Sequence, residues 1–244
     1  MRSYAQYCPI AKASEILGDR WTLLIVREML AEVSGFNELQ RGLPGISRSV
    51  LTDRLRALER AEIIERRTGP KGRTLGYRLT PAGRDLEPVV QALGEWGVTW
   101  SFTDPRPEEL DPDLLIVWMA RHVDHNELPA DRTVVQFDFS NPAKRYWMVL
   151  EPSEVSVCLQ HPGFDVDLEV AVDTATLYRV YLGRAELGAA IRARKLTMSG
   201  PRALQHGVAR WFAWSAFAPA SRSAPDRRTA AARLRGPARV RIAE

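Results

Sequence analysis

The sequence predicts a multi-domain α+β protein, and three observations lead to this fold class. In the first third of the chain, apolar residues recur at helical spacing and a short hairpin pattern follows them. After a segment rich in proline and charge, the apolar period changes to two, which is typical of an antiparallel sheet with one buried face. The last stretch is rich in alanine and arginine. We therefore divide the chain into residues 1–104, 105–219 and 220–244.

Composition and charge narrow the class of protein. A hydrophobic content of 45% and a charged content of 26% are ordinary for a globular chain of 244 residues. No apolar run approaches membrane-spanning length, the N-terminus lacks a signal-peptide core, and two cysteines are too few for a disulfide framework. We therefore expect a cytoplasmic protein with no membrane partner.

Charge is spread unevenly along the chain. Residues 1–104 contain 15 Lys and Arg against 13 Asp and Glu, a net charge of +2. Residues 105–219 contain 12 against 15, a net charge of −3, and residues 220–244 contain 7 against 2, a net charge of +5. The middle segment is therefore a poor candidate for binding a polyanion.

The segment that begins at Gly45 predicts an amphipathic helix. Ser47 is a typical N-cap, and Leu51, Leu55 and Leu58 follow at the spacing of one apolar stripe. The opposite face has hydroxyl and guanidinium groups, which can reach base edges and phosphates in a major groove. These residues are Ser49, Thr52, Asp53, Arg56 and Arg60, with Arg48 beside the N-terminus.

A hairpin pattern follows this helix. Ile63–Arg67 and Leu75–Leu79 predict two short strands, and the turn between them contains Lys71 and Arg73. A helix followed by a basic-tipped hairpin is typical of a winged helix-turn-helix, although an ordinary helix and hairpin with a solvated charged face would give a similar pattern. The positive bias of both parts favours double-stranded operator DNA as a partner. The candidate DNA-binding residues are Ser47, Arg48, Ser49, Thr52, Arg56, Lys71 and Arg73.

Three shorter helical patterns precede this segment. They cover Ile10–Leu17, the stretch from Trp21 to Leu30, and Phe36–Leu39, and a Gly-Leu-Pro-Gly turn then leads to the amphipathic helix. Helices in this order, with a tight turn before the last one, are expected for a helix-turn-helix.

Several short motifs lie in a fixed order over roughly residues 5–100. They are Cys8-Pro9, Gly18-Asp19-Arg20-Trp21-Thr22, Phe36-Asn37-Glu38-Leu39, Pro44-Gly45-Ile46-Ser47, Leu51-Thr52-Asp53-Arg54-Leu55 and Tyr77-Arg78-Leu79-Thr80-Pro81-Ala82-Gly83. Together they resemble the HxlR family of bacterial regulators. The resemblance implies a dimeric, DNA-binding winged-helix regulator. At Asp19-Arg20 the family more often has Gly-Lys, which weakens a phosphate-binding role for Arg20.

A long helix is expected from Pro81, because proline is tolerated in a first helical turn. Its broad apolar face contains Leu86, Val89, Val90, Leu93, Trp96, Gly97 and Trp100. We interpret this face as a homodimer contact that packs with residues near Tyr4 and Tyr7, as the resemblance implies. The alternative is that the second domain covers it.

The second region begins after a proline-rich linker at Asp104–Glu109. A helix over Leu110–Val123 is followed by four alternating segments, which predict an antiparallel sheet. Helices over Thr174–Tyr181 and Ala185–Arg192, a short strand over Lys195–Ser199 and an aromatic-rich helix from Pro201 complete the pattern.

Four segments of this region, over roughly residues 110–217, support a second resemblance. They are Gln136-Phe137-Asp138-Phe139, Asp167-Leu168-Glu169-Val170-Ala171-Val172-Asp173, Leu182-Gly183-Arg184 and Leu196-Thr197-Met198-Ser199-Gly200-Pro201-Arg202-Ala203-Leu204. They resemble the sterol carrier protein type 2 fold, which implies a cavity between sheet and helices for a hydrophobic small molecule. Candidate lining residues are Trp118, Phe137, Trp147, Met148 and Trp211, although these side chains could also simply fill the core.

Residues from Ala218 to Glu244 have almost no large apolar side chain and predict a flexible basic tail that adds minor phosphate contacts. His122, His125 and Glu127 resemble part of a metal site, but a solvated helix end explains them better. No phosphate loop, nucleophile elbow or paired acid and base is present, so we expect no enzyme, cofactor or metal.

Cys8 has two interpretations. The family resemblance places a cysteine here, and some members use it to sense oxidants or electrophiles. Cys8 precedes a helix start and Lys12 lies one turn on, which suits a reactive thiolate, although a small buried residue at a dimer contact is equally consistent.

These observations support a dimeric transcription regulator whose C-terminal domain binds a hydrophobic effector. The alternatives are a redox-sensing regulator that acts through Cys8, and a ligand carrier or scaffold whose winged helix mediates only protein contacts. A DNA-binding measurement distinguishes these hypotheses, because both kinds of regulator should bind DNA and the carrier or scaffold should not.

Overall fold

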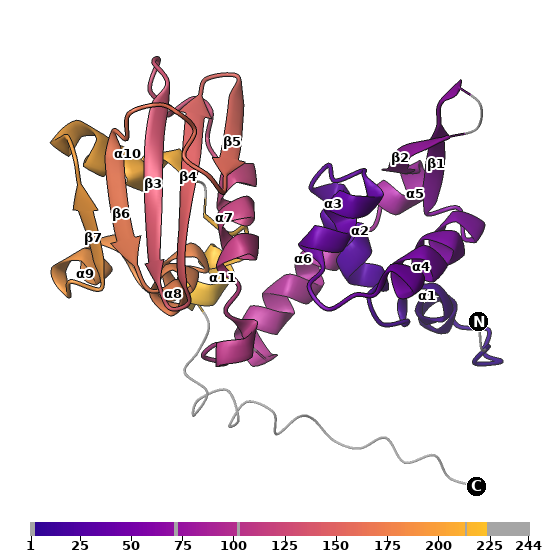
Figure 1. The fold of residues 1–244 in the computed structure, drawn as a ribbon. Coiled ribbons are helices and arrows are strands. Elements are labelled where there is room, and N and C mark those ends of the chain that lie inside the picture. Colours follow the sequence, from indigo (N-terminus) through magenta and orange to yellow (C-terminus); the bar gives the residue numbers. More distant parts are fainter. Residues whose placement is uncertain (1–2, 71–72, 102, 213, 224–244) are drawn as a thin grey trace, which may run out of the picture. The chain divides into compact units, whose positions relative to one another are not determined.

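The structure is a computed structural model that describes residues 3–70, 73–101, 103–212 and 214–223 (Figure 1). It divides into two compact units, Met1–Leu93 and Gly94–Glu244. Within the described residues, no helix is both long and apolar enough to cross a membrane. The predicted combination of a winged helix-turn-helix and a second α+β unit is confirmed, and the boundaries at 104 and 219 stay predictions.

The first unit is a small helical core with a two-stranded hairpin. Its elements are α1 (Pro9–Leu17), α2 (Thr22–Leu30), α3 (Phe36–Gly42), α4 (Arg48–Arg60), β1 (Ile64–Thr68) and β2 (Thr74–Leu79). The two strands are antiparallel, with Ile64 opposite Leu79. Apolar side chains from α2, α3, α4 and both strands form one buried cluster, so the hairpin is anchored in the same core as the helices.

Helix α4 forms as its sequence predicts. The Ser47 hydroxyl accepts a hydrogen bond from the Val50 amide at 3.2 Å, which satisfies one of the free N–H groups at the start of the helix. Leu51, Leu55 and Leu58 are buried in the core. One face of the helix is therefore fixed by packing and the other remains available to a partner.

The long helix expected from Pro81 is interrupted. It consists of α5 (Pro81–Arg84), α6 (Glu87–Trp96) and a π-helical turn (Gly97–Ser101). Pro88 has no backbone N–H and cannot donate to the carbonyl of Arg84, so the first segment ends and a new helix starts with this proline in its first turn. Leu86 and Val90 pack against the core of the first unit.

The second unit contains a five-stranded sheet in the order β5-β4-β3-β6-β7. The strands are β3 (Thr133–Ser140), β4 (Ala143–Glu151), β5 (Glu154–Cys158), β6 (Leu168–Val172) and β7 (Leu196–Ser199). The predicted antiparallel pairing is confirmed between β3 and β4, β4 and β5, and β6 and β7, whereas β6 pairs in parallel with β3. Alternation tells which face of a strand is buried but not which strand is its neighbour, so the crossover after β5 was not predictable.

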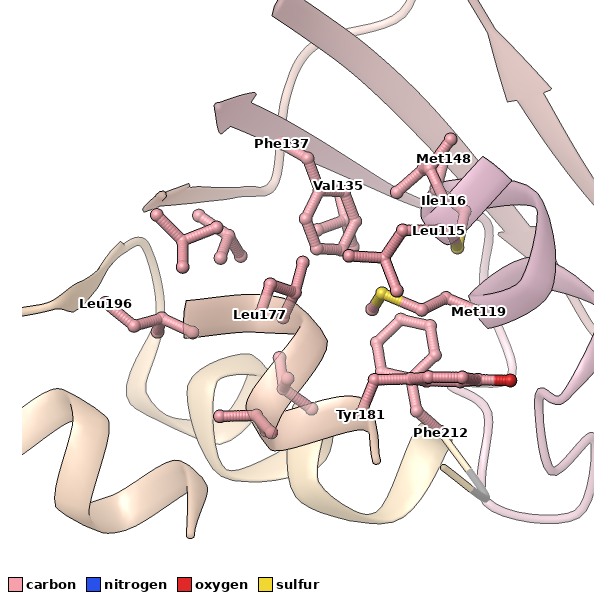
Figure 2. Packing of buried hydrophobic residues seen from close by; sticks show 14 of the residues in the cluster. Leu115, Ile116, Met119, Val135, Phe137, Met148, Leu177, Tyr181, Leu196 and Phe212 are labelled. Atoms are coloured by element: carbon pink, nitrogen blue, oxygen red, sulfur yellow. The ribbon is translucent and has the colours of Figure 1, made fainter. Parts of the chain in front are cut away.

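The helices of this unit cover one face of the sheet. A short 3-10 turn (Pro107–Glu109) leads to α7 (Pro112–Arg121), and α8 (Thr174–Tyr181), α9 (Leu187–Arg192) and α10 (Arg202–Trp211) follow. Side chains of α7, α8 and α10 pack with alternate residues of β3, β4 and β6 in a single cluster (Figure 2). Asp173 caps α8, because its carboxylate accepts a hydrogen bond from the Thr176 amide at 2.9 Å.

The chain remains ordered beyond the expected start of the tail. Ala218–Ser223 form α11, where the sequence predicted flexibility. The Ser215 amide donates to the Tyr181 carbonyl at 2.9 Å, and Ala218 is buried against Gly183, so this segment gains tertiary contacts that its composition does not indicate. Residues 224–244 lie outside the described residues, and the flexible tail stays a prediction there.

Candidate nucleic-acid interface and effector domain

The outer face of α4 has exposed charged side chains without a hydrogen bond or an ion pair to the described part of the protein. Arg56 and Arg60 are exposed, and within the described residues neither has a hydrogen bond or an ion pair. The side chain of Asp53 is also exposed and without such a partner. Guanidinium groups that are held on a rigid helix but remain free can bind phosphates or guanine.

The hydroxyl groups at the start of α4 are used within the helix. Ser47 caps it, and the Ser47 and Ser49 hydroxyls form a hydrogen bond of 3.0 Å with each other. The Thr52 hydroxyl donates to the Arg48 carbonyl at 2.8 Å. Ser47, Ser49 and Thr52 therefore shape the beginning of the helix, and any contact that they make with DNA must compete with these bonds.

Arg48 connects two helices of the motif. Its guanidinium donates to the side-chain oxygens of Asn37 and Gln40, each at 3.3 Å, and lies 4.9 Å from the ring centre of Phe36. Arg48 was predicted as a DNA-binding residue, and the structure gives it a further role in tying α3 to α4. The motif Phe36-Asn37-Glu38-Leu39 is visible in the sequence, but its contact with Arg48 depends on how α3 packs against α4.

A second arginine fixes α4 from another side. Arg54 forms an ion pair with Asp19 in the turn between α1 and α2. The Asp19-Arg20 departure from the family pattern therefore supplies a carboxylate that holds α4, while Arg20 lies 5.1 Å from the ring centre of Trp21. Sequence reasoning missed this pair because its two residues are far apart along the chain.

The hairpin has exposed cations at its tip and ion pairs along its sides. Arg67 and Arg73 are exposed and have no ion pair within the described residues, and Lys71 lies outside them. Arg66, which precedes Arg67 on β1, pairs with Glu59 at 2.8 Å. Of the predicted wing cations, Arg73 is therefore placed at the tip of the hairpin, where Arg67 joins it as a cation that sequence reasoning missed.

The hairpin is also anchored to the helices at its base. The Tyr77 amide donates to the Ser34 carbonyl at 2.9 Å. This approach is so close that a Cβ on Gly76, which has φ +158, would lie 2.8 Å from that carbonyl oxygen. The hairpin is thus fixed by a backbone contact to the turn between α2 and α3.

Large apolar side chains are exposed near the N-terminus and along α6. Tyr7 and Ile10 are almost fully exposed, and Tyr4 is more than half exposed. On α6, Val89, Leu93 and Trp96 are exposed, and Trp100 follows in the π-helical turn. Exposed apolar residues of this size are typical of an interface.

The five predicted ligand-lining residues do not form one site. Phe137, Met148 and Trp211 are buried in the core between sheet and helices, and Trp118 lies at its edge, stacked on Tyr181. Phe137 and Met148 are surrounded there by packed side chains (Figure 2).

Trp147 is on the other face of the sheet, and its place in the predicted ligand set is wrong. It packs there with Val134 and Val149, and its indole N–H donates to the Gln136 side-chain oxygen at 3.0 Å. Neighbouring residues of a strand point to opposite faces, so Trp147 and Met148 cannot line the same space.

An open groove of about 430 Å³ lies between α7 and β5. Its volume is within the range of small-molecule sites, which is roughly 300–1,000 Å³. Half of its lining residues are apolar and half are polar or charged. The lining residues are Val117, Ala120, Arg121, His125, Ser153, Glu154, Val155 and Val157. None of them was predicted, because the groove depends on how the helix packs beside an edge strand.

The residues of the suspected metal fragment have separate partners. His122 Nδ1 lies 2.8 Å from the Trp118 carbonyl, and His125 Nδ1 lies 3.1 Å from the Pro152 carbonyl. Glu127 pairs with Arg210 at 3.0 Å. Within the described part of the chain, no group of three His, Cys, Asp or Glu side chains is placed to hold a metal ion.

Cys8 is partly buried at the N-cap of α1. Lys12, the cation expected to favour its thiolate, forms an ion pair with Glu15 at 3.3 Å. The backbone amide of Tyr4 and the hydroxyl of Ser3 lower the pKa of Glu15, so this carboxylate stays ionised and offsets the Lys12 charge.

Asp113 connects α7 to β4 through two hydrogen bonds. Its carboxylate accepts from the Tyr146 hydroxyl and from the Lys144 ammonium, each at 2.5 Å. Burial opposes ionisation of Asp113, but these two donors outweigh it and lower the pKa of the carboxyl group. Burial, followed by the hydrogen bond to Asp113, strongly raises the pKa of Tyr146.

Comparisons with known families match the two units separately. Residues 16–104 match the HxlR-like helix-turn-helix family, and residues 125–212 match the SCP-2 sterol transfer family.

Curated relatives named as HTH-type transcriptional regulators match about two fifths of the chain. The uncharacterized HTH-type transcriptional regulator Rv3095 of Mycobacterium tuberculosis is 41% identical over 102 residues, which cover 41% of this chain and 61% of the relative. The uncharacterized HTH-type transcriptional regulator YvaP of Bacillus subtilis is 34% identical over 105 residues, which cover 41% of this chain and 97% of the relative. The chain thus spans less than two thirds of the mycobacterial relative.

Solved structures of transcriptional regulators are similar to a comparable share of the chain. The reduced form of the transcriptional regulator YodB from Bacillus subtilis is 31% identical, covers 39% of this chain and 96% of its own, and has a TM-score of 0.35.

Proposed function

Because the chain belongs to the HxlR-like helix-turn-helix family of transcriptional regulators, we propose that it is a homodimeric repressor or activator that binds operator DNA and responds to a hydrophobic small molecule. The observation that carries the DNA-binding part is the free guanidinium of Arg56 on the outer face of α4. The helix that presents it is held by Ser47, Arg48 and Arg54.

The DNA contact proposed here uses two kinds of cation. Arg56 can bind a guanine edge with two hydrogen bonds, which gives sequence preference. Arg67 and Arg73 at the hairpin tip bind phosphates, which gives affinity without preference. The Ser34 contact fixes the hairpin, so both kinds of cation meet the duplex at a set spacing.

Dimerisation is proposed for the exposed apolar residues near Tyr7 and along α6. Burying Tyr7, Leu93 and Trp96 against a second copy would remove a large apolar area from water. A dimer also suits a helix-turn-helix, since two copies of α4 can contact two half-sites one helical turn apart.

Effector binding is proposed for the second unit, in the groove between α7 and β5. Val117, Ala120 and Val155 supply apolar walls there, whereas the central core is already filled by its own side chains. Trp118 follows Val117 on α7 and can report a ligand through its fluorescence.

The test begins with a pool of random duplexes, from which the full chain enriches its preferred sequence. Binding of the enriched duplex is then measured by fluorescence anisotropy, with and without acyl chains or aromatic polyketides. The proposal predicts a dimer on the duplex and an effector that changes DNA affinity by a coupling free energy of about 1–3 kcal/mol. A chain that enriches no sequence would instead support the ligand carrier.

Redox control through Cys8 is a second candidate, favoured by the partly exposed thiol at the start of α1. Cys8→Ser should leave DNA affinity unchanged under reducing conditions, because the hydroxyl preserves the small side chain. A mild oxidant or quinone should alter DNA binding by the wild type but not by the variant. Identical responses of the two proteins would leave Cys8 with a packing role.

A further inference from the structure

Val50 is an exposed aliphatic residue in the first turn of α4. Its side chain is 37% exposed, whereas Leu51, Leu55 and Leu58 of the same helix are each at most 2% exposed. The N-terminal residues of a recognition helix are those that contact base edges in helix-turn-helix proteins. Val50 therefore places an apolar group where the helix would meet the duplex.

The fold itself does not require valine at this position. The backbone N–H of Val50 donates to the Ser47 hydroxyl, and every residue except proline has this N–H group. Valine is a weaker helix former than alanine because its branched Cβ restricts χ1. Its side chain is not part of the buried core of the unit. Capping, helix propensity and packing thus leave the choice of residue unexplained.

The neighbouring carboxylate indicates what this part of α4 faces. Asp53 lies three residues after Val50, so the two side chains are neighbours on the helix surface. Asp53 is exposed and has no ion pair within the described residues, so it would repel a phosphate. Amino groups on the major-groove edges of bases can instead donate to a carboxylate. This side of α4 therefore fits base edges better than the DNA backbone.

The matching apolar group in a major groove is the C5-methyl group of thymine. We propose that Val50 recognises a thymine by contact with this methyl group, an inference that rests on the proposed DNA-binding function. Arg48 is held against α3 by its hydrogen bonds to Asn37 and Gln40, so we assign the contact at the start of α4 to Val50 rather than to Arg48.

The test uses the duplex that the full chain enriches and replaces its thymines one at a time by deoxyuridine, which removes only the C5-methyl group. For the wild type, one replacement in each half-site should weaken binding about 4-fold, the value of one buried methyl group. Val50→Ala removes the contact from both protomers of the dimer, so binding to the thymine duplex should be weaker by the product of the two single replacements, about 16-fold, and neither replacement should have a further effect.

Ile191→Ala is the matched control, because Ile191 is a β-branched residue on α9 with a similar exposed fraction of 38%. This variant should respond to deoxyuridine as the wild type does. Alanine favours helix formation, so circular dichroism should show that both variants fold.

Two results would overturn the inference. One is a wild type that is indifferent to every single replacement. The other is a Val50→Ala variant that loses the same factor on replacement as the wild type, because independent effects would then simply add. If the chain enriches no duplex at all, the proposed DNA-binding function is contradicted. That result is distinguishable from a failure of the Val50 inference alone.

Discussion

Helices α4 and α7 both begin at a side-chain cap and both bury an apolar stripe, but they leave very different surfaces. Ser47 caps α4 and Asp111 caps α7, where the carboxylate accepts from the amides of Asp113 and Leu114. The outer face of α4 is exposed, and its charged residues Asp53, Arg56 and Arg60 have no ion pair within the described residues. By contrast, α7 is almost wholly apolar, and its flank forms one wall of the groove beside β5.

This difference separates two tasks. An exposed helix face with unpaired cations suits a large polyanion such as DNA, because its phosphates can contact several of these cations at once. A helix with an apolar flank beside an edge strand suits a small ligand that inserts between existing elements. We therefore propose that the two units use different kinds of helix surface, an exposed and charged one on α4 and an apolar one on α7.

The largest expected effect tests whether the two cores are separate. Leu55→Ala in α4 and Leu115→Ala in α7 each remove a side chain at most 1% exposed, so each should cost about 2–5 kcal/mol of unfolding free energy. Each variant should lower only the transition of its own unit in calorimetry. A single transition that both variants shift equally would contradict two independent cores.

The next effect compares the two kinds of cation in the DNA contact. Arg56→Ala should weaken binding to the enriched duplex by about 1–3 kcal/mol, because a bidentate contact with guanine is lost. Arg73→Ala, or Lys71→Ala in the same turn, should weaken all sequences alike and lower the slope of log affinity against log salt by about one. Anisotropy titrations at several salt concentrations measure both. An Arg56→Ala variant with unchanged affinity would show that this face does not enter the groove.

A smaller effect is expected in the groove of the second unit. Ala120→Leu adds a side chain to its wall and should reduce effector affinity about tenfold, or about 1.4 kcal/mol. DNA affinity without effector should not change. Trp118 fluorescence during ligand titration gives the affinity. Trp147→Phe is the control on the other face of the sheet, and it should bind the effector as the wild type does.

The smallest effect concerns pH. The pKa of Asp113 is lowered in the folded protein, so its ionised form stabilises the second unit at neutral pH and this contribution is lost as the pH falls through that pKa. Asp113→Asn keeps an acceptor for Tyr146 but has no charge. Its unfolding midpoint should therefore fall less than that of the wild type between neutral pH and about pH 3. Equal falls would assign the acid sensitivity to other carboxylates.

Local patterns predicted most of the first unit. The cap at Ser47, the stripe of three leucines in α4 and the hairpin all depend on residues close in sequence, and the structure confirms them. The break before α6 also has a local cause, because Pro88 cannot donate a backbone hydrogen bond within a continuous helix.

Contacts between distant residues were not predictable in the same way. The ties from Arg48 to α3 and from Arg54 to Asp19 depend on how the helices pack. The groove beside β5 depends on strand order, which alternation does not determine. The error at Trp147 is different, because alternation along β4 already placed it opposite Met148.

The parallel pairing of β3 with β6 has a consequence for the order of folding. It joins Val135 to Leu168, so a long loop must close before these strands can gain any contacts. The helices of the first unit instead form from neighbouring residues, and this unit leaves the ribosome first. Chains rich in local contacts fold faster than chains dominated by distant pairings. We therefore expect α4 to be in place while the strands of the second unit are still being synthesised.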